Sequence, residues 1–382
     1  MAFIDSCDNI NLLMKKIKKN RVLFLLHVPP PVHGASMVGL YIKQSSYINS
    51  QMASRYVSIG LSNNIQDIGV FSLLKIFRFF CILWKELIYL IAFRPSVVYV
   101  TPSSTGMAFR LDSIFVLLAK LFGRKVLLHF HNKGVCTMQN RCFDNFLYHL
   151  FFHHTKVILL TPSLYSDVKR YVERENVYFC PNGIPEQKNI CKRSHSQFNI
   201  LFLSNMIEEK GVWVLLDACR KLRDYSISFH CDFVGNWADI TECEFQAKVD
   251  SYELWDYVTA HGAQYGENKN LFFETADVLC FPSYYHNECF PLVLLEAMSY
   301  SLPCISSVEG GIPDIIEDSQ TGFVVKSNSS EVYAEKLKYL EENPVICKEM
   351  GNKAHERYMK NYTLNVFEYK FSGILNSVID NA

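Results

Sequence analysis

Short strand-like runs alternate with helix-like runs along most of this 382-residue chain, and this alternation constrains the fold more than any other feature. Apolar runs closed by Gly, Pro, Asn or Ser are typical of buried parallel strands. A first group of such runs comprises Arg21–His27, Ser96–Thr101, Lys125–Phe130, Lys156–Thr161 and Val177–Cys180. A second group comprises Asn199–Ser204, Ser228–Val234, Tyr257–His261, Val278–Ser283, Cys304–Ser306 and Gly322–Val325. The alternation predicts a doubly wound α/β fold.

The length of the chain and a turn-rich break near its middle indicate two domains. A chain of 382 residues exceeds what one hydrophobic core usually organises. The sequence P-N-G-I-P at Pro181–Pro185 separates the two groups of strands. We therefore expect a first domain over residues 1–185, a second over residues 186–360, and a helical segment over residues 361–382.

The two halves of the chain carry opposite charge although the formal net charge is zero. Residues 1–185 contain 21 Lys and Arg against 9 Asp and Glu, a net of +12, and the remaining residues contain 17 against 29, a net of −12. A basic first half can meet anionic lipid, a phosphorylated acceptor or nucleic acid. Nucleic acid is the least favoured of the three, because no binding module and no basic helix with interleaved aromatics is present in the sequence.

The cysteines and the amino terminus indicate a reducing compartment. The 13 cysteines are scattered without a C-x-x-C or a His/Cys cluster, so neither a zinc site nor a disulfide framework is predicted. Four lysines at positions 15, 16, 18 and 19 precede only a short apolar run, Val22–Leu26, which is too short for the core of a signal peptide. We therefore expect a cytoplasmic protein.

The segment Phe71–Phe93 is the most apolar part of the chain. Lys75, Arg78, Lys85 and Glu86 interrupt it, and four charges within one span-length segment argue against insertion across a membrane. Two interpretations stay open. The segment is either a domain helix packed on a sheet, or a peripheral contact with the inner face of the cytoplasmic membrane that it makes together with the lysines near the amino terminus.

The stretch E-C-F-P-L-V-L-L-E-A-M at Glu288–Met298 carries two glutamates eight residues apart across a strand-to-helix junction. The apolar run Val278–Ser283 precedes it as a buried strand. Leu292–Tyr300 then reads as a helix with Pro291 at its first helical position, where the missing N–H costs nothing. The first-turn amides of such a helix point outward and form an anion site.

The two glutamates flank this anion site. Glu288 lies in the loop ahead of the helix, and Glu296 lies one turn beyond Leu292 on the same helix face. Carboxylates accept hydrogen bonds from hydroxyls, so an anion site between two of them suits a sugar nucleotide. The helix dipole alone also favours glutamate near a helix start, so the spacing by itself leaves a structural role open.

Further polar residues follow other predicted strands, where ligands of doubly wound folds bind. Gly34, in the loop after the first strand, permits a close approach of the backbone to a ligand. His129 and His131 end a middle strand of the first group and share a face, with His131 nearer the strand end. In the second group, Lys210 follows the first strand and can neutralise a phosphate, and Gly310-Gly311 follow a later strand.

The order of these motifs resembles the family-4 retaining glycosyltransferases. The resemblance covers roughly residues 21–345 and rests on H-N, P-N-G-I, E-K-G, E-C-F-P-L-V-L-L-E-A-M and G-G-I-P-D-I-I…T-G-F in this order. It implies the GT-B fold, with two Rossmann-like domains that face each other across a cleft. The first domain would bind the acceptor and the second the nucleotide-sugar donor, while a helix within residues 361–382 would cross back to the first domain.

The resemblance also implies roles for the residues of the Glu288–Met298 stretch. Glu296 would accept hydrogen bonds from the ribose of the donor. Glu288, with the amides at Phe290 and Leu292, would hold the donor sugar and the diphosphate, and Pro291 lies within this donor-binding stretch.

Four residues outside that stretch take roles by the same resemblance. Lys210 would stabilise the departing diphosphate, and His131 would contact the donor sugar near the anomeric centre. Gly34 would let the first-domain loop close over the phosphates, and Asn205 would belong to the donor site. His131, Glu288 and Lys210 are therefore the expected catalytic residues of a retaining, metal-independent hexosyltransferase. It would use no cofactor and would take a UDP- or GDP-sugar as its donor.

The chain departs from the family pattern at several positions. Ser204-Asn205 stands where Gly-Arg is usual, so one cationic phosphate ligand is missing, and Lys133 is a candidate to replace it from across the cleft. Cys289 stands where glycine is usual, and Asp314 where glutamate is common. Acceptor choice would lie in first-domain loops, around Ser103–Arg110 and Lys133–Arg141.

The function that we expect is transfer of a sugar to a hydroxyl of a glycan, with a lipid-linked bacterial surface-polysaccharide precursor (O-antigen or capsule) as the acceptor. Two alternatives remain. One is another GT-B enzyme such as a nucleotide-sugar epimerase. The other is a catalytically silent glycan-binding partner, which the missing arginine favours.

Overall fold

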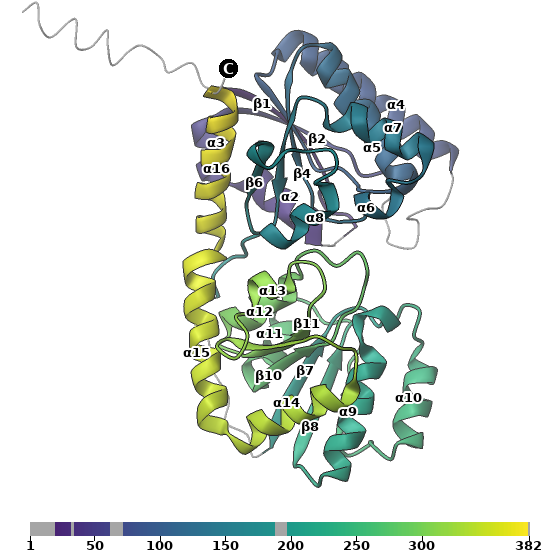
Figure 1. Ribbon diagram of the computed structural model, residues 1–382, viewed down its shortest axis with the longest axis vertical. Helices are drawn as coiled ribbons and strands as arrows, with labels where there is room; N and C mark the ends of the chain where they lie inside the picture. Colours follow the sequence, from purple (N-terminus) through teal and green to yellow (C-terminus); the bar gives the residue numbers. More distant parts are fainter. Residues whose placement is uncertain (1–19, 32–33, 62–71, 188–196, 381–382) are drawn as a thin grey trace, which may run out of the picture.

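Two parallel β-sheets of six strands each organise the chain. The computed structural model describes residues 20–31, 34–61, 72–187 and 197–380 (Figure 1). The strand orders are β2-β1-β3-β4-β5-β6 and β12-β11-β10-β7-β8-β9, and every neighbouring pair is parallel. Helices cover both faces of each sheet. The predicted α/β class with two Rossmann-like units is confirmed.

The first sheet lies in the amino-terminal unit. Its strands are β1 (Arg21–Leu26), β2 (Ala53–Ser58), β3 (Val97–Val100), β4 (Lys125–His129), β5 (Thr155–Leu159) and β6 (Val177–Phe179). Its helices are α2 (Gly34–Gln44), α3 (Ser46–Gln51), α4 (Leu73–Ile88), the π-helical turn η2 (Tyr89–Phe93), α5 (Gly106–Leu121), α6 (Val135–Met138), α7 (Cys142–Phe152) and α8 (Tyr165–Val168).

Strand β2 is absent from the predicted strands. Its sequence, A-S-R-Y-V-S, has no apolar run, and within it only Val57 is buried. Among the strands that the structure describes, β2 is an edge strand that pairs only with β1, so one of its sides needs no hydrophobic cover. A continuous apolar run identifies only the buried central strands of a parallel sheet, so this criterion does not detect β2.

The second sheet has the same architecture. Its strands are β7 (Phe198–Leu203), β8 (Phe229–Val234), β9 (Val258–Ala260), β10 (Val278–Phe281), β11 (Cys304–Ser307) and β12 (Gly322–Val325). Its helices are α9 (Val212–Asp224), α10 (Glu242–Ser251), α11 (Gly266–Thr275), α12 (Leu292–Ser299), α13 (Ile312–Ile315) and α14 (Ser330–Glu342).

Two carboxyl-terminal helices run along both units in Figure 1. Helix α15 (Pro344–Asn361) packs on α12, and α16 (Leu364–Asp380) packs on the first sheet. The ring of Phe371 in α16 lies 5.1 Å from that of Tyr99 in β3, and Lys125 Nζ donates to the carbonyls of Val378 and Ile379 at 3.0 and 2.8 Å. Helix α16 is therefore anchored on the first unit.

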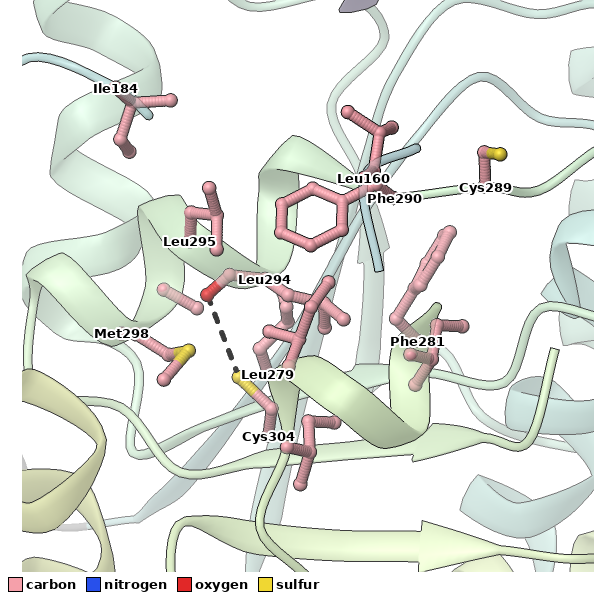
Figure 2. Packing of buried hydrophobic residues seen from close by; sticks show 14 of the residues in the cluster. Leu160, Ile184, Leu279, Phe281, Cys289, Phe290, Leu294, Leu295, Met298 and Cys304 are labelled. Atoms are coloured by element: carbon pink, nitrogen blue, oxygen red, sulfur yellow. Dashed lines mark hydrogen bonds between the residues drawn. The ribbon is translucent and has the colours of Figure 1, made fainter. Parts of the chain in front are cut away.

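Helix α12 sits on a core to which both units contribute. Figure 2 shows Phe290, Leu294 and Leu295 packed over the second sheet, with Leu160 and Ile184 of the first unit nearby. Helix α12 begins at Leu292, and Pro291 is its N-cap with an extended backbone (φ −67°, ψ 117°). The prediction that Pro291 is the first helical residue is thus wrong by one position, because its ψ is not helical.

Helix α4 and η2 together contain residues 73–93 of the apolar segment, while Phe71 lies outside the described residues. Phe79, Glu86 and Leu90 are buried against the unit, whereas Phe77, Phe80 and Trp84 are more than half exposed. Among the helices of the described ranges, none combines the length and the apolarity needed to span a membrane. The helix packs on the domain and still presents apolar side chains outward.

The Glu86 carboxyl is fully buried, and within the described part of the chain neither of its oxygens has a hydrogen-bond partner. Burial raises its pKa to about 9. Because the folded-state pKa lies above the unfolded value, the group costs stability as the pH rises from about 4.5 to about 9, on the order of 3 kcal/mol by pH 7.

We therefore expect Glu86→Gln to raise the free energy of unfolding, and to do so more at pH 8 than at pH 5.5. Urea unfolding at the two pH values measures this difference. Glu253→Gln, at a side chain that is 73% exposed, is the control and should change little at either pH. An equal effect of Glu86→Gln at both pH values would contradict the assigned protonation.

Candidate active site

A cavity of about 1320 Å³ lies between the two units at the carboxyl ends of their strands. In the second sheet, β7 and β10 are neighbours at the point where the strand order reverses, which is where doubly wound folds bind ligands. Asn205 and Lys210 follow β7, and Glu288 follows β10. In the first unit, the loops after β1 and β4 contribute Gly34 and His131.

All nine residues that the sequence singled out for catalysis or donor binding line this one cavity. They are Gly34, His131, Asn205, Lys210, Glu288, Phe290, Pro291, Leu292 and Glu296. Residues from four separate stretches of the chain thus meet, because the strand ends of both sheets point at the same space.

Lys210 and Glu288 form an ion pair in the wall of the cavity. Lys210 Nζ lies 2.5 Å from Glu288 Oε2 and 4.4 Å from the ring centroid of Tyr285. The side chains of Lys210 and Glu288 are only 15% and 10% exposed, so their geometry is fixed by packing. The short helical turn Glu208–Lys210 and Gly211, with φ +87°, set the direction of the lysine. A cation held in this way is prepared to meet an anionic ligand that displaces the carboxylate.

Glu296 also has a cationic partner, which the sequence did not reveal. Lys269 Nζ, from α11, lies 2.7 Å from Glu296 Oε1, and both residues line the cavity. The carboxylate keeps acceptor sites for hydroxyl groups beside this bond. Helix α11, which contains Lys269, has no clear apolar face, so the spacing of its residues did not predict a role for Lys269.

The two histidines after β4 have different environments. His129 is fully buried, and its Nδ1 lies 2.8 Å from the hydroxyl of Tyr99. Burial, together with the neighbouring His131, lowers the pKa of His129 well below its ordinary value, so this ring stays neutral. The ring centroids of His129 and His131 are 4.2 Å apart, and His131 alone lines the cavity. The cavity-facing histidine is thus the one nearer the strand end.

Gly34 brings the first unit close to helix α12. A Cβ atom added to Gly34 would lie 3.9 Å from Leu292 Cδ1, across the cavity. Gly34 opens α2, and Ser36 Oγ donates to the carbonyl of Pro31 at 2.8 Å, which fixes the end of the loop. Val32 and His33 of this loop lie outside the described residues.

Two further residues of the cavity wall were missed by the sequence reasoning. Asp112 in α5 accepts the backbone N–H of Ser103 at 2.8 Å, and burial raises the pKa of its carboxyl to about 7. Asn182 is 3% exposed, and within the described ranges its Oδ1 has no hydrogen-bond partner. A lone acid within an apolar helix is the signal that could have identified Asp112.

The departures from the family pattern have physical explanations in the structure. Lys133 forms an ion pair with Glu309 of the second unit and does not line the cavity, so the hypothesis that it replaces the missing arginine is not supported. Cys289 is buried and is not among the described residues with positive φ. Asp314 accepts bonds from the amide and hydroxyl of Ser163 at 3.2 and 2.5 Å, which ties the two units together.

A metal site is not evident among these residues. In the ranges that the structure describes, no group of three or more His, Cys, Asp or Glu side chains is arranged to hold a metal ion. The charged groups that the cavity does offer are three lysines, at positions 75, 210 and 269, and the carboxyls of Asp112, Glu288 and Glu296.

Comparison with known proteins points to glycosyltransferases. Residues 183–357 match the family described as glycosyl transferases group 1. The putative colanic acid biosynthesis glycosyltransferase WcaL of Escherichia coli (strain K12) is 27% identical over 152 residues, which are 38% of this chain and 36% of that protein. The amylovoran biosynthesis glycosyltransferase AmsK of Erwinia amylovora is 29% identical over 156 residues, 39% of this chain and 38% of that protein. The chain thus spans just over a third of the length of these relatives.

Solved structures show the same fold over nearly the whole chain. A glycosyltransferase from Rickettsia africae ESF-5 has a TM-score of 0.75 and 17% identity, covering 95% of this chain and 100% of that one. Anabaena Alr3699/HepE in complex with UDP and glucose has a TM-score of 0.69 and 15% identity, covering 94% and 100%. Residues 183–357 thus match the glycosyl transferases group 1 family, and the two six-stranded units of the chain have the GT-B architecture of solved glycosyltransferases.

Proposed function

We propose that this protein is a glycosyltransferase that moves a sugar from a nucleotide-sugar donor to a hydroxyl of a glycan in bacterial surface-polysaccharide synthesis. The observation that carries the proposal is the Lys210–Glu288 pair, which shares one cavity with Glu296 and the start of α12. The names of WcaL and AmsK, which refer to colanic acid and amylovoran biosynthesis, support the polysaccharide acceptor.

The second unit would bind the donor, for which a UDP- or GDP-sugar is the proposal. The HepE structure, which is a complex with UDP and glucose, supports a nucleoside diphosphate as part of the donor. Lys210 and the first-turn amides of α12 would meet the diphosphate, since both supply positive potential. Glu296 would accept the ribose hydroxyls beside its bond to Lys269.

The chemical step would retain the anomeric configuration and use no metal ion. The bond from the anomeric carbon to the phosphate oxygen breaks, and the acceptor oxygen attacks from the same face. The acceptor proton passes to the departing phosphate. Lys210 and the helix-start amides would stabilise the charge that develops on this phosphate, a contribution of about 3 kcal/mol per donor in comparable sites. His131 would contact the donor sugar near the anomeric centre.

A thermal-shift panel of UDP-, GDP- and ADP-sugars tests the donor site. A ligand that binds only the folded state raises the melting temperature, and at 100 times its Kd it adds about 2.7 kcal/mol of stability. We expect a shift with one nucleotide class, lost in Glu296→Ala and retained in Glu342→Ala, whose side chain pairs with Lys338 on the surface. No shift with any nucleotide would favour the silent partner.

Asn205 is the observation that favours a silent partner, because it lines the cavity where the family has arginine. A donor-consumption assay separates the candidates once the nucleotide is known. Release of free nucleotide with sugar incorporated into an acceptor supports the transferase. Isomerised sugar nucleotide without release of free nucleotide would support the epimerase.

We also propose a peripheral contact of the first unit with an anionic membrane surface, with a lipid-linked glycan as the acceptor. Helix α4 presents Phe77 and Trp84, which are 67% and 64% exposed, beside Lys75, Arg78 and Lys85 of the same helix. Apolar side chains flanked by cations suit a lipid interface. The lysines near the amino terminus, which belong to the predicted contact, lie outside the described residues.

Flotation with anionic liposomes measures this contact. We expect the protein to float at low salt and less so at high salt, because the electrostatic part is screened. Trp84→Ser should lower the floated fraction severalfold. Trp255→Ser, at a tryptophan of the second unit that is 57% exposed, should leave it unchanged. Equal flotation of wild type and Trp84→Ser would contradict the proposal.

A further inference from the structure

The cavity extends beyond the proposed reaction centre into the first unit. There its wall is formed by α4 and α5, through Ile76, Phe79, Met107 and Leu111. These side chains are apolar and face a space that the nucleotide sugar of the second unit would not fill. The first-unit end of the cavity therefore differs in chemistry from the donor end.

A second hollow of about 510 Å³ continues the first along the seam between the same two helices. Phe80 lines both hollows. This second hollow is here called the α4–α5 groove. The rest of its wall is apolar and includes Leu83, Trp84, Leu87, Ile114 and Leu118.

The two helices advance in step along this seam. From the cavity to the far end of the groove, the lining residues run from Ile76 to Leu87 on α4 and from Met107 to Leu118 on α5. Eleven residues of helix correspond to roughly 16 Å. The groove and the apolar end of the cavity thus lie end to end along the two helices, with Phe80 at their boundary, and are together called the apolar track.

The side chain of Lys75 lies at the boundary between the polar part of the cavity and the apolar track. Lys75 lines the cavity beside Ile76. The order of environments from the reaction centre outward is therefore polar, cationic and apolar. A glycan joined through phosphate to a hydrocarbon chain has its parts in this same order.

We propose that the α4–α5 groove binds the hydrocarbon chain of a phosphate-linked amphiphilic acceptor, with Lys75 at its phosphate. This proposal rests on the proposed function and specifies the acceptor side of the same site. The groove would bind one extended hydrocarbon chain by direct contact. This role differs from contact of the helix with a bilayer surface.

Monoalkyl phosphates used below their micelle concentrations test the groove without a known acceptor. Each buried methylene contributes roughly fourfold in affinity, so octyl phosphate should bind at least tenfold more tightly than butyl phosphate. Trp84 lies in the groove wall, and a blue shift of its emission should accompany binding. Equal affinity for the butyl and octyl esters would overturn the proposal.

A matched pair of substitutions localises the chain. Ile114→Glu places a charge in the groove, and Ile91→Glu places the same charge on η2 outside it; the two side chains are 41% and 55% exposed. Dodecyl phosphate should bind at least tenfold more weakly to Ile114→Glu and within twofold of wild type to Ile91→Glu. Equal losses in both variants would overturn the proposal.

Two further measurements separate other outcomes. If both variants lose flotation with anionic phospholipid vesicles while neither changes dodecyl phosphate binding, the face is a membrane contact alone and the groove proposal fails. The nucleotide-sugar thermal shift should persist in Ile114→Glu. A wild type with no nucleotide shift that still shows the chain-length dependence would contradict the proposed function and leave the groove standing.

Discussion

Lys210→Ala is expected to lower kcat by on the order of 10²–10³-fold, because this lysine would carry most of the charge stabilisation at the leaving diphosphate. Asn205 supplies no charge where the family has arginine, so Lys210 has no cationic neighbour after β7 to share the role. Its ammonium is held by Glu288 at 2.5 Å and by the ring of Tyr285 at 4.4 Å. Because the ammonium of Lys210 is already held in place, it needs little reorganisation to stabilise the transition state.

The control for this prediction is Lys221→Ala. Lys221 also forms an ion pair, with Glu331 on α14, but lies outside the residues that line the cavity. Its removal should leave kcat within about twofold, since isolated surface pairs contribute little. Steady-state kinetics with a saturating donor measure both variants. A Lys210→Ala enzyme that keeps a third or more of wild-type kcat would show that another group stabilises the leaving diphosphate.

Removal of Lys210 also leaves Glu288 as an unpaired, nearly buried carboxylate. Part of the loss could then come from a distorted site, because an uncompensated buried charge is costly. The double variant Lys210→Ala/Glu288→Gln removes this charge. Because Glu288 belongs to the proposed site as well, thermal unfolding and not kcat measures the distortion. A distorted site lowers the melting temperature of Lys210→Ala and the double variant restores it, whereas a loss that reflects the missing cation alone leaves the melting temperature of Lys210→Ala near that of the wild type.

The sequence predicted the buried part of the fold well, because a parallel strand covered on both faces must be apolar throughout. β10 shows this property along its whole length, and β1 shows it from Val22 to Leu26. The edge strand β2 does not, since solvent reaches one of its sides, and alternation within six residues that include Arg55 was too weak to detect. A local sequence pattern thus identifies a strand only where burial on both faces requires all of its residues to be apolar.

The site was predictable to the extent that it lies at strand ends. Gly34, Lys210 and Glu288 follow strands, and the fold brings strand ends together regardless of sequence separation. Lys269 and Asp112 come from helix faces whose rotation only tertiary packing determines, so no spacing rule finds them. Lys133 follows a strand as well, but its long side chain turns to Glu309 instead of the cavity. Position in the fold is therefore easier to predict than side-chain direction.

Gly310→Ala is expected to disrupt the site through the backbone of Glu288. Gly310 has φ +56°, and a Cβ atom there would lie 2.1 Å from the carbonyl oxygen of Glu288 and 3.2 Å from Cys289 Cα. Gly311 donates its N–H to the Cys289 carbonyl at 2.8 Å, so the two segments cannot separate without losing this bond. The Glu288 backbone would have to move by about 1 Å, and a displacement of this size can cost on the order of 10² in rate.

Gly123→Ala separates this contact from the cost of the backbone conformation. Gly123 has φ +65°, and no atom lies within 4 Å of a Cβ added to it. Alanine in the left-handed region therefore costs both variants about 1 kcal/mol of stability. Only in Gly310→Ala does the added methyl group also collide with a neighbouring atom. Urea unfolding and kcat should therefore diverge: Gly123→Ala loses about 1 kcal/mol of stability and no activity, whereas Gly310→Ala loses more stability and about a hundredfold in kcat. Equal losses in the two variants would mean that the loop after β11 yields to the methyl group, and that Glu288 is not positioned by this glycine.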